Sequence, residues 1–186
     1  MARRNKTLIE LSVQNLIDCS IFDDGCTRGK PSGAIMAVNL KGGIQSAESY
    51  PYEGKEGTCR FDKDLRALNI GFARHVPYRN ERMLQEHVAK YGPIAVLIDA
   101  SSSSFKNYKS GIYFNDNCRQ AKNALNHAML VVGYGTDNER GDYWILVSAQ
   151  LTLKLSYFVT SLLTNFSLSN RKTLGEQDGA SRAICA

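Results

Sequence analysis

Apolar residues recur every three or four positions between residues 80 and 91, a spacing that predicts an amphipathic helix. The apolar members of this segment are Met83, Leu84, Val88 and Tyr91. Asn80 is suited to the N-cap position, and Gly92-Pro93 ends the pattern. A helix over Asn80 to Tyr91 is the clearest element that the pattern predicts.

Three later segments are predicted to be strands. Ile94 to Ile98 is an unbroken apolar run of strand length, typical of a fully buried strand. Leu125 to Val132 and Tyr143 to Val147 are predicted as two further strands, joined by a polar turn over Thr136 to Gly141.

The first part of the chain is predicted to be helical. Pro31 to Leu40 carries an apolar stripe, with Pro near its first turn and Gly42-Gly43 just past its end. Residues 8–19 show a shorter, ambiguous helical pattern, and residues 20–33 are rich in turn residues. Helices early and strands late predict an α+β fold. Residues 148–186 change to a Ser-, Thr- and Asn-rich texture and are expected to be a divergent, poorly ordered tail.

Charge and hydropathy exclude several classes of function. The formal net charge is +5 with a pI near 9.0, but the basic residues are scattered and no nucleic-acid-binding signature accompanies them. We therefore expect a solvated basic surface and no nucleic-acid partner. No apolar run approaches the roughly 18 residues of a membrane span, so we expect no membrane insertion. The first residues lack the apolar region of a secretory signal.

The five cysteines form no C-x-x-C pair, so neither their spacing nor any other motif predicts a metal site. An odd, well-spread set instead indicates an incomplete disulfide framework. Phosphate-binding, zinc-helix and serine-elbow motifs are also absent from the sequence, and we expect no cofactor.

His127 is the one histidine in a suggestive setting, at the start of the apolar run that ends in Gly133-Tyr134-Gly135. A single histidine beside a strand is most often structural. The alternative is a catalytic base, and the residues around His127 are needed to decide between them.

Six stretches of the chain, in order, resemble motifs of the papain-like cysteine peptidases and within them the cathepsin L branch. They are Leu11-Ser12-Val13-Gln14-Asn15-Leu16-Ile17-Asp18-Cys19, Gly25-Cys26-Thr27-Arg28-Gly29, Tyr50-Pro51-Tyr52, Phe105 to Tyr113, Asn126-His127-Ala128 through Gly135, and Tyr143-Trp144. The resemblance implies a papain-like two-lobe fold, here incomplete. It implies a partial peptidase domain over 8–147, helix-rich over about 8–79 and β-rich over about 80–147.

The resemblance also implies a mechanism, in which a cysteine thiolate attacks a peptide bond and a histidine is the base. His127 takes the position of that histidine. The family's nucleophilic cysteine and oxyanion glutamine would fall before Met1, and either Ser148 or Ala149 stands where the orienting asparagine is expected. We interpret this pattern as a chain shortened at its start and replaced at its end.

More of the family's substrate-binding residues than of its catalytic residues have counterparts in this sequence. Gly29 takes the place of a glycine that hydrogen-bonds extended substrates, while Arg28 replaces the glycine before it. Four further residues match the pocket for the second substrate residue: Pro31, Leu97, Leu125 and Asn126. Leu97 and Leu125 would serve equally well as plain core.

The resemblance further implies a disulfide between Cys19 and Cys59. Cys26 and Cys118 match cysteines whose family partners have no counterpart here, so they are expected to be free thiols or to form wrong pairs. Cys185 matches nothing in the family.

The sequence therefore indicates a papain-like cysteine peptidase homologue that is inactive as these 186 residues. Its alternatives are a non-catalytic peptide- or inhibitor-binding protein and an unstable product. The implied partners are an extended peptide or protein substrate, or a cystatin-like inhibitor. The implied compartment is lysosomal or extracellular.

Overall fold

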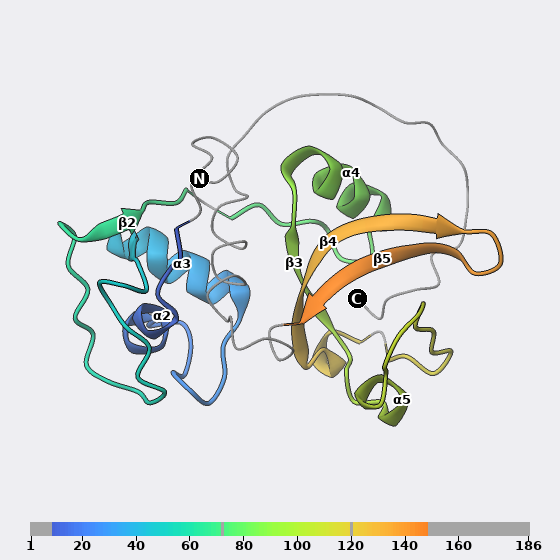
Figure 1. The fold of residues 1–186 in the computed structure, drawn as a ribbon, viewed down its shortest axis with the longest axis horizontal. Helices are drawn as coiled ribbons and strands as arrows, with labels where there is room; N and C mark the ends of the chain where they lie inside the picture. The colour runs from blue at the N-terminus through green and yellow to red at the C-terminus, as the bar shows by residue number, and fades with distance from the viewer. Residues whose placement is uncertain (1–8, 72, 120, 149–186) are drawn as a thin grey trace. The chain divides into compact units, whose positions relative to one another are not determined.

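A computed structural model describes residues 9–71, 73–119 and 121–148, which divide at Val76 into two compact units (Figure 1). Unit 1 contains α2 (Val13–Cys19), α3 (Pro31–Lys41) and a two-stranded sheet of β1 (Ile44–Gln45) and β2 (Arg66–Leu68). Unit 2 contains α4 (Glu81–Tyr91), β3 (Ile94–Ile98), α5 (Ser103–Lys106), the 3-10 helix η1 (Lys122–Ala124), β4 (His127–Asp137) and β5 (Gly141–Ser148). The mixture of helices and sheets confirms the predicted α+β class.

A capping serine and a glycine with positive φ determine where the helices of unit 1 begin and end. The Ser12 side chain accepts a hydrogen bond from Asn15 N–H, so α2 begins at Val13 and is shorter than the predicted segment 8–19. Leu11 instead forms a β-bridge with Ser46. The helix α3 extends one residue past the prediction and ends at Gly42, whose φ of 83° needs a glycine.

Unit 1 has a small apolar core and, beside it, several buried polar side chains. The core consists of Leu11, Ile35, Val38, Ile44, Leu68 and Ile70. The polar side chains of Gln14 and Gln45 are 0% and 2% exposed. Gln14 accepts from Glu53 N–H and donates to the Lys55 carbonyl, and Gln45 accepts from Asp62 N–H. These amides fix the irregular segment 50–62 by hydrogen bonds to its backbone.

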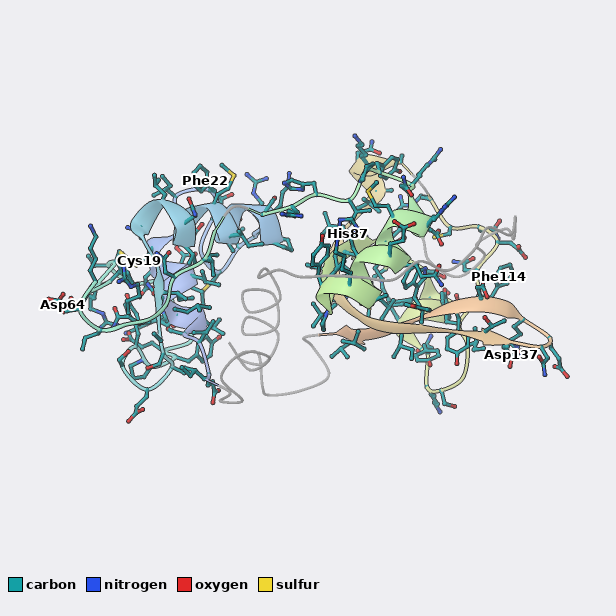
Figure 2. The ribbon with its side chains drawn as sticks, turned by 90° about the horizontal axis from the view of Figure 1, so that it is seen from above. Cys19, Phe22, Asp64, His87, Phe114 and Asp137 are labelled. Carbon is teal, nitrogen blue, oxygen red and sulfur yellow. A yellow bond between two sulfur atoms is a disulfide. The ribbon has the colours of Figure 1, made fainter. Side chains whose placement is uncertain are left out.

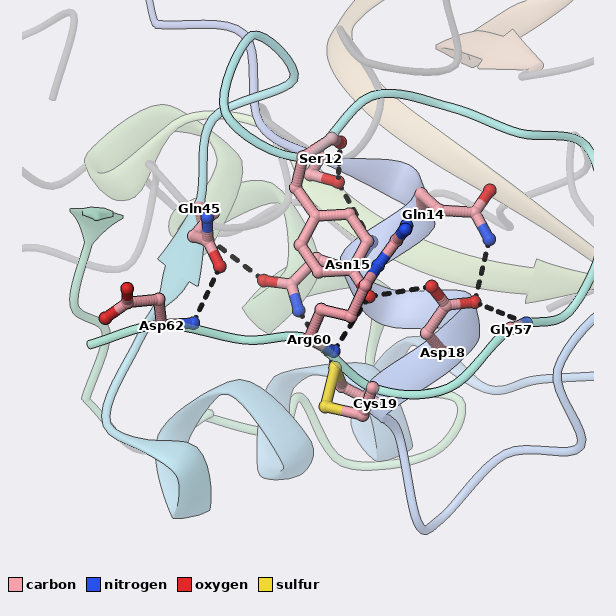
Figure 3. Close-up of a disulfide and its surroundings, with 11 residues drawn as sticks. Ser12, Gln14, Asn15, Asp18, Cys19, Gln45, Gly57, Arg60 and Asp62 are labelled. Atoms are coloured by element: carbon pink, nitrogen blue, oxygen red, sulfur yellow. Dashed lines mark hydrogen bonds between the residues drawn. A yellow bond between two sulfur atoms is a disulfide. The ribbon is translucent and has the colours of Figure 1, made fainter. Parts of the chain in front are cut away.

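Cys19 and Cys59, the pair that the resemblance implies, are joined by a disulfide with an S–S distance of 2.07 Å (Figure 3). The bond closes a loop of 40 residues between α2 and the segment that follows β1. Cross-linking a loop of this size removes conformational freedom from the unfolded chain and is worth about 2–4 kcal/mol.

Asp18 adds a third anchor for the segment 50–62. Its carboxylate accepts hydrogen bonds from Gln14 Nε2 (2.7 Å), Tyr50 Oη (2.7 Å) and Gly57 N–H (2.9 Å), as Figure 3 shows for the labelled donors. Burial opposes ionisation, but the hydrogen bonds from Tyr50, Gln14 and Gly57 outweigh it and hold the pKa of Asp18 below its usual value.

The sheet of unit 2 has the order β3-β4-β5, with both pairs antiparallel, and α4 lies against one face of it (Figure 1). Leu84 and Val88 of α4 form the core with Val131 of β4. Asn80 caps α4 through its side-chain oxygen, which accepts from Met83 N–H, as the sequence predicted. Trp144 Nε1 donates to Glu81 Oε2 at 3.3 Å and joins β5 to the first turn of α4.

Two strand predictions needed correction. Only Ile98 of β3 is buried, so the prediction of a fully buried strand there is wrong, because β3 is an outer strand of the sheet. The strand β4 begins at His127 rather than Leu125 and continues to Asp137, beyond the predicted turn start. Gly133 and Gly135 lie inside the hairpin, opposite Ile145 and Tyr143. A Cβ at residue 135 would come within 2.6 Å of Tyr143 Oη.

The first prediction concerns the replacement of Asp18 by Asn. Because the folded pKa is lowered, the carboxylate stabilises the fold above its unfolded pKa of about 3.9, and this stabilisation is lost as the pH falls through the folded pKa. We expect faster hydrogen exchange of backbone amides in residues 50–60 at pH 7, with the difference from the native chain shrinking below about pH 4.

Asp64→Asn, at an exposed aspartate of the same unit, is the matched control and is expected to leave this exchange unchanged. An equal difference between Asp18→Asn and the native chain at pH 7 and pH 3 would contradict the assignment.

Candidate functional site

His127 is the first residue of β4 and lies directly opposite Ile98, the last residue of β3. It is half-buried. The next pair in the ladder is Leu97 with Ala128, so these two side chains share one face of the sheet. The antiparallel register thus places the backbones of Leu97 and His127 side by side, with the His127 side chain on the face of Ile98 and the Leu97 side chain on the opposite face.

Asn126 fixes the backbone that enters β4. Its N–H donates to the Ile98 carbonyl at 3.0 Å, and its side-chain Oδ1 accepts from Ala100 N–H at 2.8 Å. Its Nδ2 also donates to Asp99 Oδ1 at 3.5 Å. Asn126, which directly precedes His127, therefore holds the residues after β3 against the start of β4. This positioning role was not foreseen from the sequence, which suggested only a pocket residue.

Asp99 and Arg119 form an ion pair beside this junction. Arg119 donates from Nε to Asp99 Oδ2 at 2.8 Å and from Nη2 to Oδ1 at 3.1 Å, and the Asp99 side chain is 5% exposed. Hydrogen bonds from Arg119, then from Ser101, hold the pKa of Asp99 well below its usual range, and the pKa of Arg119 is raised in turn. The carboxylate therefore remains charged far into the acid range.

Sequence reasoning missed this ion pair because its two partners are 20 residues apart and belong to no motif. It also missed Ala128, which shares the sheet face of Leu97. The alternation of side chains along a strand was the available signal for Ala128, since Asn126 and Ala128 are two positions apart.

Leu97 and Leu125 are both half-buried. Leu125 follows η1 directly and has an extended backbone that leads into Asn126. Partial exposure leaves both leucines able to contact a ligand, and it does not distinguish this role from a place at the edge of the core.

Gly29 lies in an exposed segment of unit 1 between a tight turn and α3. Asp24 N–H donates to the Arg28 carbonyl at 2.9 Å, which closes the turn before Gly29. Lys30 N–H donates to Asp23 Oδ1 at 2.7 Å, and Pro31 is the first residue of α3. Among the described residues, the N–H and carbonyl of Gly29 itself have no hydrogen-bond partner.

Asp23 organises this loop. Its carboxylate accepts from Ser20 Oγ at 2.6 Å as well as from Lys30 N–H. A Cβ added at residue 33 would lie 2.6 Å from Asp23 Oδ1, so Gly33 gives the carboxylate room at the start of α3. The Lys30 side chain provides no cap for α3, and the negative charge of Asp23 is favourable at that helix end.

The cysteines differ in state. Cys26 is an exposed free thiol in the turn before Gly29, where its N–H donates to Glu56 Oε1. Cys118 is disulfide-bonded, so the alternative of a free thiol at that residue is wrong. Neither Cys26 nor Cys118 lies at the N-terminus of a described helix, the position that lowers the pKa of a thiol nucleophile.

Two other predictions concern the end of β5 and metal binding. Ser148, one of the two residues expected in place of the orienting asparagine, pairs with Met129 in the sheet. Ala149, the other, lies outside the described residues, as do Cys185 and the predicted tail. Within the described ranges, no three His, Cys, Asp or Glu side chains are grouped as a metal site requires.

The second prediction concerns the replacement of Asp99 by Asn. The neutral amide has one acceptor oxygen and cannot form the two-pronged ion pair with Arg119, so the segment that holds Asn126 is expected to open more often. We expect hydrogen exchange of Ala100 N–H to accelerate several-fold, roughly as the loss of one charge-assisted hydrogen bond predicts. An NMR exchange experiment on the full chain measures this.

Arg119→Lys keeps the charge but not the two-pronged geometry and is expected to give an intermediate rate. Unchanged exchange at Ala100 in Asp99→Asn would show that the ion pair does not position this segment.

The chain is similar to a family of known proteins and to several of its members. A model of the family described as papain family cysteine protease matches residues 1–149. The chain is 39% identical to cathepsin K of Mus musculus over 146 residues, which are 78% of this chain and 44% of that protein. It is 40% identical to cathepsin L of Sarcophaga peregrina over 147 residues, 77% of this chain and 42% of that protein.

Among solved structures, digestive procathepsin L2 proteinase from the Tenebrio molitor larval midgut matches with a TM-score of 0.72 and 36% identity. The match covers 79% of this chain and 45% of that one. The chain thus spans less than half the length of these relatives.

Proposed function

The chain belongs to the papain family of cysteine proteases, and we propose that its residues supply the histidine base and part of the peptide-binding surface of a cysteine-type endopeptidase. The observation that carries the proposal is the position of His127 at the start of β4, where Asn126 and the Asp99–Arg119 pair hold the backbone.

In this reaction the base and the nucleophile exchange one proton. A cysteine thiol gives its proton to the His127 imidazole, and the resulting thiolate attacks the carbonyl carbon of a peptide bond. The C–N bond breaks as the imidazolium returns the proton to the leaving amine. Water, deprotonated by His127, then hydrolyses the thioester and restores the thiol.

A polypeptide of these 186 residues does not complete this cycle by itself. Cys19 and Cys59 are bound to one another, Cys118 is also disulfide-bonded, and Cys26 lies in an exposed turn. None of these cysteines combines a free thiol with a helix N-terminus, so none is activated as the mechanism requires. Ser148 and Ala149 also lack an amide that could orient His127.

A specific observation favours a second function, the binding of peptides without cleavage. Gly29 is exposed, and its backbone N–H and carbonyl have no partner among the described residues. An extended peptide can form main-chain hydrogen bonds at such a position. Gly29 and Pro31 are the contacts that unit 1 is proposed to offer a peptide substrate or a cystatin-like inhibitor. Leu97, Leu125 and Asn126 are proposed, separately, as contacts that unit 2 offers such a ligand.

The compartment belongs to the same proposal. A disulfide such as Cys19–Cys59 persists in oxidising surroundings, which supports a lysosomal or extracellular site of action. The described residues contain no helix with the length and apolar character needed to cross a bilayer.

The third prediction concerns hydrolysis. The purified 186-residue polypeptide, supplied with a fluorogenic peptide under reducing conditions that leave its fold intact, is expected to show no turnover. The control is the same assay after His127→Ala, which is expected to give the same background.

Turnover that disappears both in His127→Ala and after treatment with a thiol-directed epoxide would overturn the proposed inactivity. Failure of the polypeptide to show any cooperative thermal transition would instead favour the alternative of an unstable product.

A further inference from the structure

We propose that the loop around Gly29 selects extended peptides with acidic side chains, and that Arg28 and Lys30 determine this preference. The inference rests on the proposed peptide-binding role of this loop and adds a substrate class to it. It is carried by two exposed cations that flank Gly29, whose backbone N–H and carbonyl have no partner among the described residues.

Hydrogen bonds within the loop already use the backbone groups on either side of Gly29. The Arg28 carbonyl is taken by Asp24 N–H, and Lys30 N–H is taken by the Asp23 carboxylate. Gly29, between them, keeps both its donor and its acceptor available within the described part of unit 1. A peptide strand paired with Gly29 would therefore place its own side chains beside Arg28 and Lys30.

Arg28 is prepared to bind a carboxylate. Its side chain is 82% exposed, and its Nε donates to Asp24 Oδ2. In the described part of the chain its two terminal nitrogens have no further partner. A guanidinium held by its Nε can direct its Nη groups toward a second carboxylate, and such charge-assisted hydrogen bonds are stronger than neutral ones.

Lys30 provides a second, separate cation. The residue is exposed, it makes no side-chain hydrogen bond at the start of α3, and no described acidic group forms an ion pair with its ammonium. Its backbone is extended, with φ of −125° and ψ of 139°, so Arg28 and Lys30 lie at alternate positions of one segment.

Three acidic residues lie beside the two cations and affect how the loop can prefer acidic peptides. The Asp23 carboxylate accepts hydrogen bonds from Ser20 Oγ and Lys30 N–H. The Asp24 carboxylate accepts from Arg28 Nε, and the Glu56 carboxylate accepts from Cys26 N–H. These three carboxylates outnumber the two cations by one, so the loop has no excess of positive charge to attract an acidic peptide from a distance. The preference therefore comes from direct contact with Arg28 and Lys30 rather than from steering at a distance.

The fourth prediction tests this preference by fluorescence anisotropy with the full 186-residue chain. The probes are labelled peptides of about eight residues that alternate Glu-Leu, Gln-Leu or Lys-Leu, so that one face of the extended peptide presents the same polar residue type to both Arg28 and Lys30. We expect the Glu-Leu peptide to bind about 5- to 20-fold more tightly than the Gln-Leu peptide, as two exposed ion pairs predict.

Matched variants separate the two cations from the net charge of the chain. Arg28→Gln with Lys30→Gln is expected to abolish the preference for Glu-Leu. Lys41→Gln with Arg66→Gln removes the same charge at the other end of α3, where Arg66 donates to the Gly42 carbonyl, and is expected to preserve it. Lys30→Glu, at the cation without an ion pair, is expected to turn the preference toward Lys-Leu.

Equal binding of the Glu-Leu and Gln-Leu peptides by the native chain, or tighter binding of Lys-Leu, would overturn this inference and leave the peptide-binding proposal standing. Binding of none of the three peptides would instead remove the peptide-binding proposal on which it rests.

Discussion

Polar side chains hold the irregular segments of this protein in place by hydrogen bonds to their backbones, and the buried ones, Gln14 and Gln45, need these partners because water does not reach them. Gln14, Asp18 and Gln45 in unit 1 accept from or donate to the backbone between residues 50 and 62. Asp23 takes the Lys30 N–H at the start of α3, and Asn126 takes the Ala100 N–H at the end of β3. Each side chain gives a loop one defined position, and the proposed functional residues lie on or next to these loops.

In both candidate regions an aspartate carboxylate holds the backbone beside a proposed functional residue. In unit 2 the Asp99 carboxylate, bound by Arg119 and Ser101, holds the segment to which Asn126 is attached, and the next residue is His127. In unit 1 the Asp23 carboxylate holds the backbone after Gly29 and leaves Gly29 itself available. A base needs a fixed backbone beneath its side chain, whereas a peptide-binding segment needs free backbone groups, and the hydrogen bonds of the two regions differ accordingly.

Much of the fold could be predicted from the sequence where one local signal was sufficient. Asn80 as the cap of α4, Pro31 at the start of α3 and the apolar strand Ile94–Ile98 follow from spacing and from backbone chemistry. The predicted strand ended at Val132, before Gly133-Tyr134-Gly135, whereas β4 continues through both glycines, which lie opposite Ile145 and Tyr143. Cross-strand packing decides that position, and a single segment carries no information about its partner.

The candidate site was predictable in its residues and much less so in its contacts. The order of the motifs was enough to identify the family and to propose His127 as its catalytic histidine. The Asp99–Arg119 pair and the role of Asn126 depend on segments brought together by the β3–β4 register, which no local pattern reveals. The motif from Leu11 to Cys19 proves to be structural, since Ser12 caps α2, Gln14 and Asp18 anchor a loop, and Cys19 forms a disulfide.

The central claim, that His127 is the base of a cysteine peptidase site, is tested most directly by reconstitution. The chain would be joined to two segments of an active relative, one with the nucleophilic cysteine and oxyanion glutamine and one with the orienting asparagine. Peptide hydrolysis would be measured with and without His127→Ala. The account predicts turnover that falls by about a thousand-fold or more when His127 is replaced, since a base and its nucleophile act as one unit. Turnover of the reconstituted chain that is unaffected by His127→Ala would contradict it.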